Sequence, residues 1–183
     1  ITAAALYEEM AKADAGFFTT IAASNLGYKP VLIAGNEEQK QFASDILLEG
    51  GYGAFCLTEP MGGSDPSSCK TTAVKDGDEY VLNGRKCFIT NGGIADFYIV
   101  TAMTDKSKGV KGMSAFYVEK GTPGLSVGNE ENKMGIRTSN TTDVIFEDMR
   151  VPASAMIGAE GTGFKTCMET LDITRALMGI GAT

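Results

Sequence analysis

Two short, polar, glycine-rich segments each follow an apolar run and carry groups that can bind an anion or a flat ring. In the first, "TEPMGGSD" from Thr58 to Asp65, small residues let backbone N–H groups converge on an anion, and Ser64 adds a hydroxyl donor. In the second, "KCFITNGG" over residues 86–93, Phe88 and Thr90 share one strand face because side chains alternate. An aromatic ring beside a hydroxyl suits a flat heterocycle with polar ring atoms. Together the two segments favour a site for one flat, phosphate-bearing ligand.

A purely structural interpretation of both segments is the alternative. Glycine permits positive φ at a hairpin or barrel corner, and nearby Asp or Ser side chains bond the local backbone. Phe88 and Ile89 would then be core residues of a strand. The first segment has neither the G-K-[ST] ending of a Walker A loop nor the spacing G-x-G-x-x-G. Two loops of the same design make a ligand site a stronger interpretation than either loop alone.

Composition limits the class of protein and its partners. The 183 residues are 43% hydrophobic and 21% charged, which is typical of a folded globular protein. The net charge of −7 argues against nucleic-acid binding, which requires a basic surface. No apolar run approaches the roughly 20 residues that span a bilayer. We therefore expect neither a nucleic-acid partner nor a membrane span.

The cysteine and histidine content restricts the chemistry. None of the four cysteines forms a C-x-x-C pair, and the chain has no histidine, so we expect no metal site. The cysteines are interpreted as buried or half-buried thiols in a reducing compartment: Cys56, Cys69, Cys87 and Cys167. Without histidine, Ser-His and Cys-His arrangements are excluded. A general base must be a carboxylate, a lysine or a tyrosine, or must lie outside this chain.

Helices are expected at both ends of the chain. Residues 1–48 are rich in helix formers, with Gly27 and Pro30 punctuating the pattern. Asn36 and Gln39 form the pattern of a capping box, and the glycines at 50 and 51 end that helix. Residues 162–183 again place apolar side chains at intervals of three and four.

The middle of the chain is β-prone. Short runs alternate with turn residues from about residue 53 to residue 150, and Asp76-Gly77 gives a hairpin signal. Helical runs do not separate these strands, which favours an antiparallel barrel or sandwich over βαβ units. We predict an α+β protein with an end of a helical domain at 1–50, a β domain at 51–155 and the start of a second helical domain at 156–183. The chain begins without methionine and stops inside a helical pattern, which predicts a fragment of a larger subunit.

Six ordered blocks carry a family resemblance over nearly all of the chain. The sequence resembles the acyl-CoA dehydrogenase family in these blocks, in this order: "AGNEEQK", "FCLTEPMGGSD", "NGRKCFITNGGIADFYIV", "KGMSAFYVEKGTPGLSVG", "MGIRTSNTTDVIFEDMRVP" and "GFKTCMETLDITR". The resemblance implies an N-terminal helical domain, a middle β domain and a C-terminal helical bundle. This chain is similar to the end of the first, all of the second and the opening helix of the third.

The resemblance also implies FAD as the cofactor and assigns its contacts. These would come from both loops: Phe55, Cys56, Leu57, Thr58, Gly63, Ser64, Phe88, Ile89 and Thr90. Thr90 would reach toward the reactive flavin nitrogen, and Ser64 would lie by the phosphates and the thioester. Many members have tryptophan or tyrosine where Phe55 and Phe88 stand. Phenylalanine keeps the aromatic face but lacks a hydrogen-bond donor.

The segment "LDITR" resembles the part of the family that contacts the substrate. Asp172, Thr174 and Arg175, together with Ser64, would then bind acyl-CoA. A surface ion pair between Asp172 and Arg175 at spacing i, i+3 is the structural alternative. Some branched- and long-chain members place the catalytic glutamate at the position of Thr174, and others place it further along, beyond residue 183. We therefore expect no catalytic base within this chain.

The predicted function is that of a fragment of a FAD-dependent acyl-CoA dehydrogenase. Such an enzyme removes hydrogen from the α and β carbons of an acyl-CoA, passes electrons to an electron-transferring flavoprotein and usually forms a homotetramer. The location would be the cytoplasm of a bacterium or the mitochondrial matrix. An acyl-CoA oxidase and an enoyl-CoA reductase are the nearest enzyme alternatives. A non-catalytic flavin- or CoA-binding module, or a folded remnant, is the alternative of another class.

Overall fold

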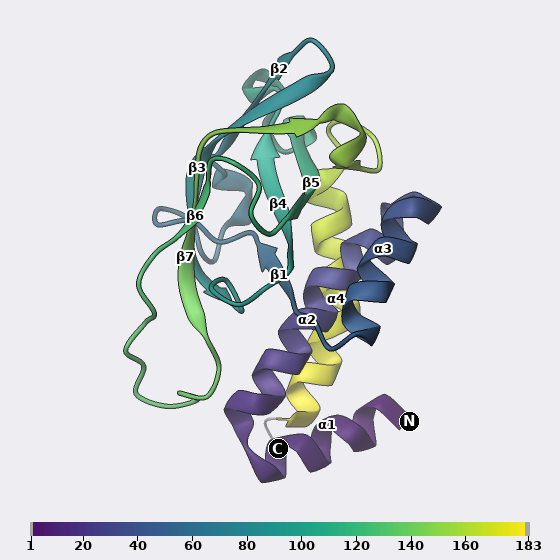
Figure 1. Cartoon of the computed structure of the whole chain (residues 1–183), viewed down its shortest axis with the longest axis vertical. Helices are drawn as coiled ribbons and strands as arrows, with labels where there is room; N and C mark the ends of the chain where they lie inside the picture. Colours follow the sequence, from purple (N-terminus) through teal and green to yellow (C-terminus); the bar gives the residue numbers. More distant parts are fainter. Residues whose placement is uncertain (1, 182–183) are drawn as a thin grey trace.

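Along the chain, helices come before and after a β domain, as predicted (Figure 1). The computed structural model describes residues 2–181, so Ile1, Ala182 and Thr183 of the predicted terminal helices lie outside the described residues. Three helices come first and one comes last: α1 (Thr2–Ala13), α2 (Ala15–Ala34), α3 (Glu37–Leu48) and α4 (Gly163–Gly181). None of the helices in the described range is long and apolar enough to cross a membrane.

Helix α2 continues through Gly27 and Pro30, so the interruption predicted there is wrong. The chain breaks earlier, at Asp14, whose carboxylate accepts the backbone N–H of Phe17 at 2.6 Å. Gly27 serves a close contact instead, since a Cβ there would lie 3.0 Å from the backbone nitrogen of Ala54. Pro30 costs the helix a hydrogen bond, but it is buried. Tertiary packing of α2 outweighs the local preference of these two residues.

The capping box at the start of α3 is confirmed. The Asn36 side chain accepts the backbone N–H of Gln39 at 2.8 Å, and the Gln39 side chain accepts that of Asn36 at 3.0 Å. The Gln39 amide also donates to the carbonyl oxygens of Ser154 and Met156. The cap therefore ties α3 to the segment that follows the last long strand.

The β-prone middle of the chain forms strands, and β2 and β3 fold as the predicted hairpin. The strands are β1 (Gly53–Cys56), β2 (Thr72–Asp76), β3 (Glu79–Thr90), β4 (Phe97–Met103), β5 (Met113–Glu119), β6 (Leu125–Val127), β7 (Thr141–Pro152) and the unpredicted β8 (Met156–Ile157). Asp76 pairs with Glu79, so the β2–β3 hairpin turns at Gly77–Asp78, one position later than Asp76-Gly77. Most pairs are antiparallel, but β1 runs parallel to β4, and β2 meets β4 through the single parallel pair Thr72–Met103.

The sheet is open and folds over one main core. Its order is β6-β7-β3-β2-β4-β5-β8, with β1 beside β4. One apolar cluster joins both halves of this order, with Leu82 and Phe146 from β3 and β7 and with Tyr98 and Phe116 from β4 and β5. A second cluster packs the other face of β1, β4 and β5 against the helices, for example Ile99 against Val31 and Cys167. This layering confirms the helix-flanked α+β class.

A buried ion pair connects the first glycine-rich loop to strand β3. Lys86 is fully buried and Glu59 is 6% exposed, and the Lys86 ammonium donates to the Glu59 carboxylate at 2.8 Å. The ammonium also donates to the Thr101 hydroxyl at 3.0 Å. The carboxylate accepts the backbone N–H groups of Lys70 and Thr71 and the Thr71 hydroxyl. Both charges are therefore paired and hydrogen-bonded, as buried charges must be.

Replacing Lys86 with methionine is expected to lower the free energy of unfolding by about 3–5 kcal/mol, because the Glu59 carboxylate stays buried without a counter-charge. The double variant Glu59→Gln/Lys86→Met should lose less, since glutamine keeps an acceptor oxygen and neither charge remains. Urea denaturation measures both losses. Lys12→Met, which removes an exposed lysine paired with Glu8 and Glu9, is the control and should change little. Equal losses for Lys86→Met and Lys12→Met would contradict the importance of the buried pair.

The same pair predicts a loss of stability in acid. Burial alone would raise the pKa of Glu59, but Lys86 and the hydrogen bonds from Thr71 and Lys70 lower it to about 2, from an ordinary value of 4.5. A carboxyl with a lowered folded-state pKa contributes stability that is fully present above pH 4.5 and is lost as the pH falls through about 2. Acid titration of the unfolding free energy should be less steep in this range for Glu59→Gln than for the unchanged chain. Equally steep curves would rule out this role of Glu59.

Candidate functional site

The two glycine-rich loops predicted to share a ligand lie against each other. The backbone N–H of Cys87 donates to the carbonyl oxygen of Thr58 at 2.9 Å, where β3 passes the end of β1. The buried pair of Glu59 and Lys86 joins the same two segments one residue away on each side. Two segments of the chain that are separated in the sequence are thereby held side by side.

The side chains of the first predicted contacts point into the protein core. Phe55 packs in the helix-facing cluster, and Cys56 is fully buried in the main core. Burial raises the pKa of the Cys56 thiol to about 12, so it is no nucleophile at neutral pH. Only backbone atoms of these two residues remain for a ligand. Leu57 and Thr58 follow at the end of β1 and are half-buried.

Gly63 and Ser64 lie exposed in the first loop. A Cβ at Gly63 would have only the Thr58 methyl group near it, at 4.0 Å. The packing of the chain itself therefore does not require glycine here, whereas a ligand close to the backbone would. The Ser64 hydroxyl takes part in none of the hydrogen bonds found among residues 2–181, so it is available as a donor.

Phe88 is presented to solvent by a β-bulge. The register of β3 against β7 shifts between Lys86 and Ile89, and Phe88 has a φ of +55° there. Positive φ is rare for a bulky residue and is found where the backbone serves a functional constraint. The Phe88 ring is 66% exposed, whereas Ile89 is buried, so the core interpretation holds for Ile89 only. The bulge, which alternation alone does not predict, is what exposes the ring.

Asn91 anchors the end of β3 and was overlooked in the sequence. It is fully buried with a φ of +64°, and its amide donates to the carbonyl oxygens of Thr20 and Gly53 at 2.9 and 3.2 Å. The strand end that carries Thr90 is thereby fastened to α2 and β1. The available signal was an asparagine before two glycines, since asparagine tolerates left-handed backbone better than most residues.

Thr90 and Thr174, far apart in the sequence, line one cavity of about 110 Å³. Its walls come from α1, α2, α4 and the end of β3: Tyr7, Thr19, Ala22, Ala23, Asn25, Leu26, Thr90, Thr174, Leu177 and Met178. The Thr174 hydroxyl donates to the carbonyl oxygen of Thr170 at 2.9 Å, so it is already engaged. The Thr90 hydroxyl makes no hydrogen bond within the described part of the chain. Thr90 thus offers a free donor beside an apolar space.

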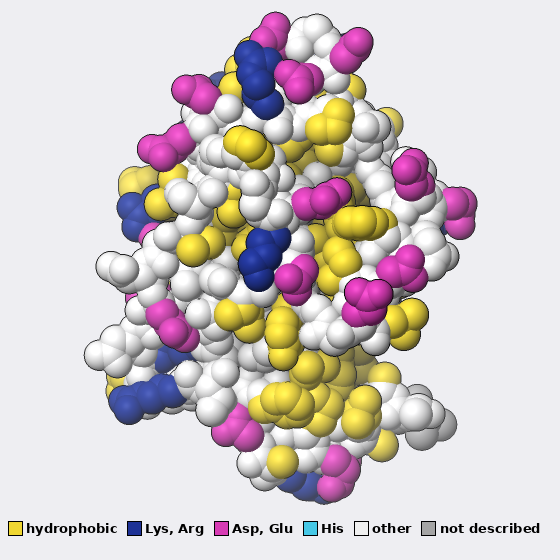
Figure 2. Space-filling view, in the orientation of Figure 1, with side chains coloured by type: hydrophobic (Ala, Val, Ile, Leu, Met, Phe, Trp, Pro, Cys, Tyr) yellow, Lys and Arg dark blue, Asp and Glu magenta, His cyan; other side chains and the backbone are white. Residues whose placement is uncertain are grey.

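The helices around this cavity also present apolar side chains to solvent. Figure 2 shows hydrophobic side chains gathered where α1, α2 and α4 lie. The exposed apolar residues of these helices include Leu6, Phe17, Ile173 and Met178. Met178 belongs to both the cavity and the surface, so the cavity adjoins this apolar face.

The other two predicted substrate contacts do not reach the cavity. Asp172 and Arg175 are exposed on α4 and are not among its lining residues. Nor are they joined to each other by any of the ion pairs found between residues 2 and 181. Of the "LDITR" segment, only Thr174 is brought together with the predicted cofactor residues.

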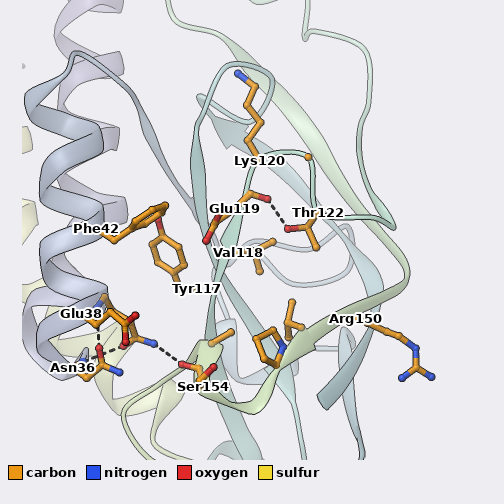
Figure 3. A pocket seen from close by; sticks show the side chains of 15 residues that line it. Asn36, Glu38, Phe42, Tyr117, Val118, Glu119, Lys120, Thr122, Arg150 and Ser154 are labelled. Carbon is orange, nitrogen blue, oxygen red and sulfur yellow. Dashed lines mark hydrogen bonds between the residues drawn. The ribbon is translucent and has the colours of Figure 1, made fainter. Parts of the chain in front are cut away.

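A larger cavity of about 580 Å³ lies elsewhere, between α3, β5 and β7 (Figure 3). Phe42 and Tyr117 meet edge to face there, with ring centroids 5.8 Å apart. Its rim mixes acidic and basic side chains, including Glu119 and Lys120. None of the predicted site residues lines it, so cavity size alone does not identify the functional site.

The four cysteines and the possible metal ligands of the described chain give little support for thiol or metal chemistry. All four cysteines are free thiols. Burial is the main reason that the pKa of Cys69, beside Glu59 and Lys86, rises to about 11. No cluster of three or more possible metal ligands occurs in the described range. The arrangement is suited to holding a ring and an alkyl group.

Comparison with known proteins gives concordant matches. The family model "Acyl-CoA dehydrogenase, middle domain" matches residues 54–149. The short-chain specific acyl-CoA dehydrogenase of Megasphaera elsdenii is 53% identical over 90% of this chain and 44% of that protein. The acryloyl-CoA reductase (NADH) of Anaerotignum propionicum is 54% identical over 81% of this chain and 38% of that protein.

A solved structure agrees in fold. A chain from the structure of the electron transferring flavoprotein of Acidaminococcus fermentans is 51% identical, with a TM-score of 0.93 over 96% of this chain and 47% of the matched chain. This chain spans less than half the length of these relatives. Because the family model matches more than half of its residues, the chain belongs to the acyl-CoA dehydrogenase family.

Proposed function

We propose that this chain supplies the flavin-binding middle part and part of the acyl site of an enzyme that dehydrogenates an acyl-CoA at its α and β carbons. The observation that carries the proposal is the position of Thr90. Its free hydroxyl lies at an apolar cavity shared with Thr174, two residues after the exposed Phe88 ring. A donor at an alkyl-sized space, with an exposed aromatic ring two residues before it in the chain, supports the proposal.

The residues present fit FAD. Phe88 would stack on the ring system, Thr90 would donate to a ring nitrogen, and Ser64 would donate to a phosphate. The open space above Gly63 lets backbone N–H groups approach an anion. FAD, when bound, supplies an acceptor for the hydride that leaves the β carbon. The protein holds the acyl chain and the ring in reactive orientation and excludes water.

Removal of the α proton requires a base that the cavity does not contain. None of the ten lining residues is a carboxylate, and the Thr174 hydroxyl is both weakly basic and engaged with Thr170. We infer that the base is a glutamate supplied by a part of the enzyme other than residues 2–181. Asp172 and Arg175 remain proposed contacts to the substrate from the exposed face of α4.

The proposed partners are an electron-transferring flavoprotein and further copies of the subunit in a tetramer. The match to a chain from an electron transferring flavoprotein structure supports the first of these. A 54% identical relative is named as a reductase, so the physiological direction is a separate question. Reoxidation of the flavin by air, by the electron carrier or by an enoyl-CoA would distinguish an oxidase, a dehydrogenase and a reductase.

Thr90→Ala in the flavin-loaded product of the complete gene is expected to slow flavin reduction by roughly tenfold. One lost hydrogen bond of about 1–2 kcal/mol accounts for that factor. Stopped-flow bleaching of the flavin by acyl-CoA thioesters measures the rate, and flavin absorbance measures occupancy.

Two further variants make the Thr90 test specific. Thr90→Ser keeps a hydroxyl and should retain most of the rate. Ser64→Ala should mainly weaken the binding of cofactor or CoA, because a phosphate keeps its charge throughout the reaction. If Thr90→Ala leaves the reduction rate unchanged while the flavin stays fully bound, the proposed placement of Thr90 is wrong.

The 183-residue chain alone is expected to give no dehydrogenation of acyl-CoA with an artificial electron acceptor, even with excess FAD. The cavity lacks a base, and FAD should bind weakly because part of its contact surface lies in other parts of the enzyme. Equilibrium dialysis with FAD and a dye-reduction assay measure the two effects. Tight stoichiometric binding, or turnover by the chain alone, would refute this division of the site.

A further inference from the structure

A tyrosine from α1 forms one wall of the cavity that contains Thr90 and Thr174. Tyr7 is 6% exposed and is the only lining residue that α1 contributes. The Asn25 amide on α2 donates to the Tyr7 hydroxyl at 3.1 Å. The Tyr7 ring also packs edge to face on Phe18, with centroids 5.3 Å apart. Contacts on the ring and on the hydroxyl therefore hold this wall in one position.

The remaining lining residues suit an uncharged alkyl group. Within residues 2–181 none of the lining side chains is charged, and the apolar walls on α2 and α4 are Ala22, Ala23, Leu26, Leu177 and Met178. Thr19 donates its hydroxyl to the carbonyl oxygen of Ala15 at 2.7 Å, as Thr174 does to that of Thr170. A polar or charged occupant would find few partners here, whereas burying methylene groups is favourable.

The volume of the cavity limits the length of that alkyl group. An apolar protein cavity of about 150 Å³ holds benzene, which has six carbons. In the same proportion, the 110 Å³ found here holds roughly four carbons. A longer chain that extends toward α1 would meet the Tyr7 ring, which is one of the walls of the cavity.

We propose that Tyr7, held by Asn25, is a specificity-determining residue that restricts the acyl group to roughly four carbons. The proposal rests on the proposed function, because it assigns this cavity to the acyl group of the thioester. Thr90 marks the cofactor end of the cavity, and the alkyl chain runs from there between α2 and α4 to the Tyr7 ring.

Straight-chain alcohols test the length limit on the 183-residue chain itself. Butanol, hexanol and octanol are titrated while the labelled methyl groups of Ala22, Leu177 and Met178 are followed by NMR. In the unchanged chain, affinity should stop rising beyond butanol. In Tyr7→Ala it should continue to rise to hexanol, by about fourfold for each added methylene.

Matched variants separate the tyrosine ring from general loosening of α1. Leu6→Ala removes a neighbouring side chain that is exposed and outside the cavity, so the limit at butanol should persist. Tyr7→Phe keeps the ring and loses only the bond to Asn25, so it should also keep the limit. If Tyr7→Ala does not fold, Tyr7→Leu provides the shortened wall. An unchanged limit in a folded Tyr7→Ala or Tyr7→Leu chain overturns the proposal.

A second measurement assigns the cavity to the acyl group. In the flavin-loaded product of the complete gene, kcat/KM should be highest for a four-carbon acyl-CoA, and Tyr7→Ala should move the maximum to six carbons. If the enzyme dehydrogenates acyl-CoA but Tyr7→Ala does not change the chain length at which kcat/KM is highest, the role of Tyr7 is refuted. The proposed function stays intact in that case. If Tyr7→Ala shifts the alcohol limit but acyl-CoA does not reduce the flavin, the proposed function has failed. The assignment of the cavity to the acyl group then fails with it.

Discussion

The buried ion pair of Glu59 and Lys86 is the interaction on which the candidate site depends. Lys86 lies on β3 and Glu59 lies in the loop after β1, so the pair joins the two segments that carry the proposed flavin contacts. Two charges in the core are tolerated only because each is hydrogen-bonded as well as paired. The carboxylate also accepts the amides of Lys70 and Thr71, so it closes the far end of the glycine-rich loop. Removing the Glu59 carboxylate would take away both its bond to Lys86 and its bonds to the amides of Lys70 and Thr71.

A second constraint acts where β3 ends. The bulge at Phe88 and the left-handed turn at Asn91 lie on either side of Thr90, and both place non-glycine residues at positive φ. Such backbone persists only when surrounding contacts determine it, and the three bonds of the Asn91 amide to α2 and β1 provide them. The positions of the exposed ring and of the free hydroxyl therefore follow from buried residues that touch no proposed ligand.

The helices contribute the apolar half of the site. Gly27 allows α2 to lie close to β1, and α4 packs against both α1 and α2. The cavity remains between these helices and the end of β3. The Thr19 and Thr174 hydroxyls bond to helix carbonyl oxygens, so apolar groups and the free Thr90 hydroxyl are left to line the space. Polar and apolar parts of the site thus come from different layers of one fold.

The sequence by itself predicted helical structure at both ends of the chain, the β-prone middle, the capping box at Asn36 and the family. These features follow from local periodicity, from capping and turn residues, and from ordered motifs. All of these signals depend on residues that are close together in the sequence. The period of two also places Lys86 on the inward face of β3, a signal that was available. Its partner Glu59, the bulge that exposes Phe88 and the uninterrupted course of α2 through Pro30 were decided by the tertiary structure. The tertiary structure also decided that Tyr7, Thr90 and Thr174 line one cavity. These residues are more than eighty positions apart, and their contacts depend on the packing of distant segments, which no local sequence pattern encodes.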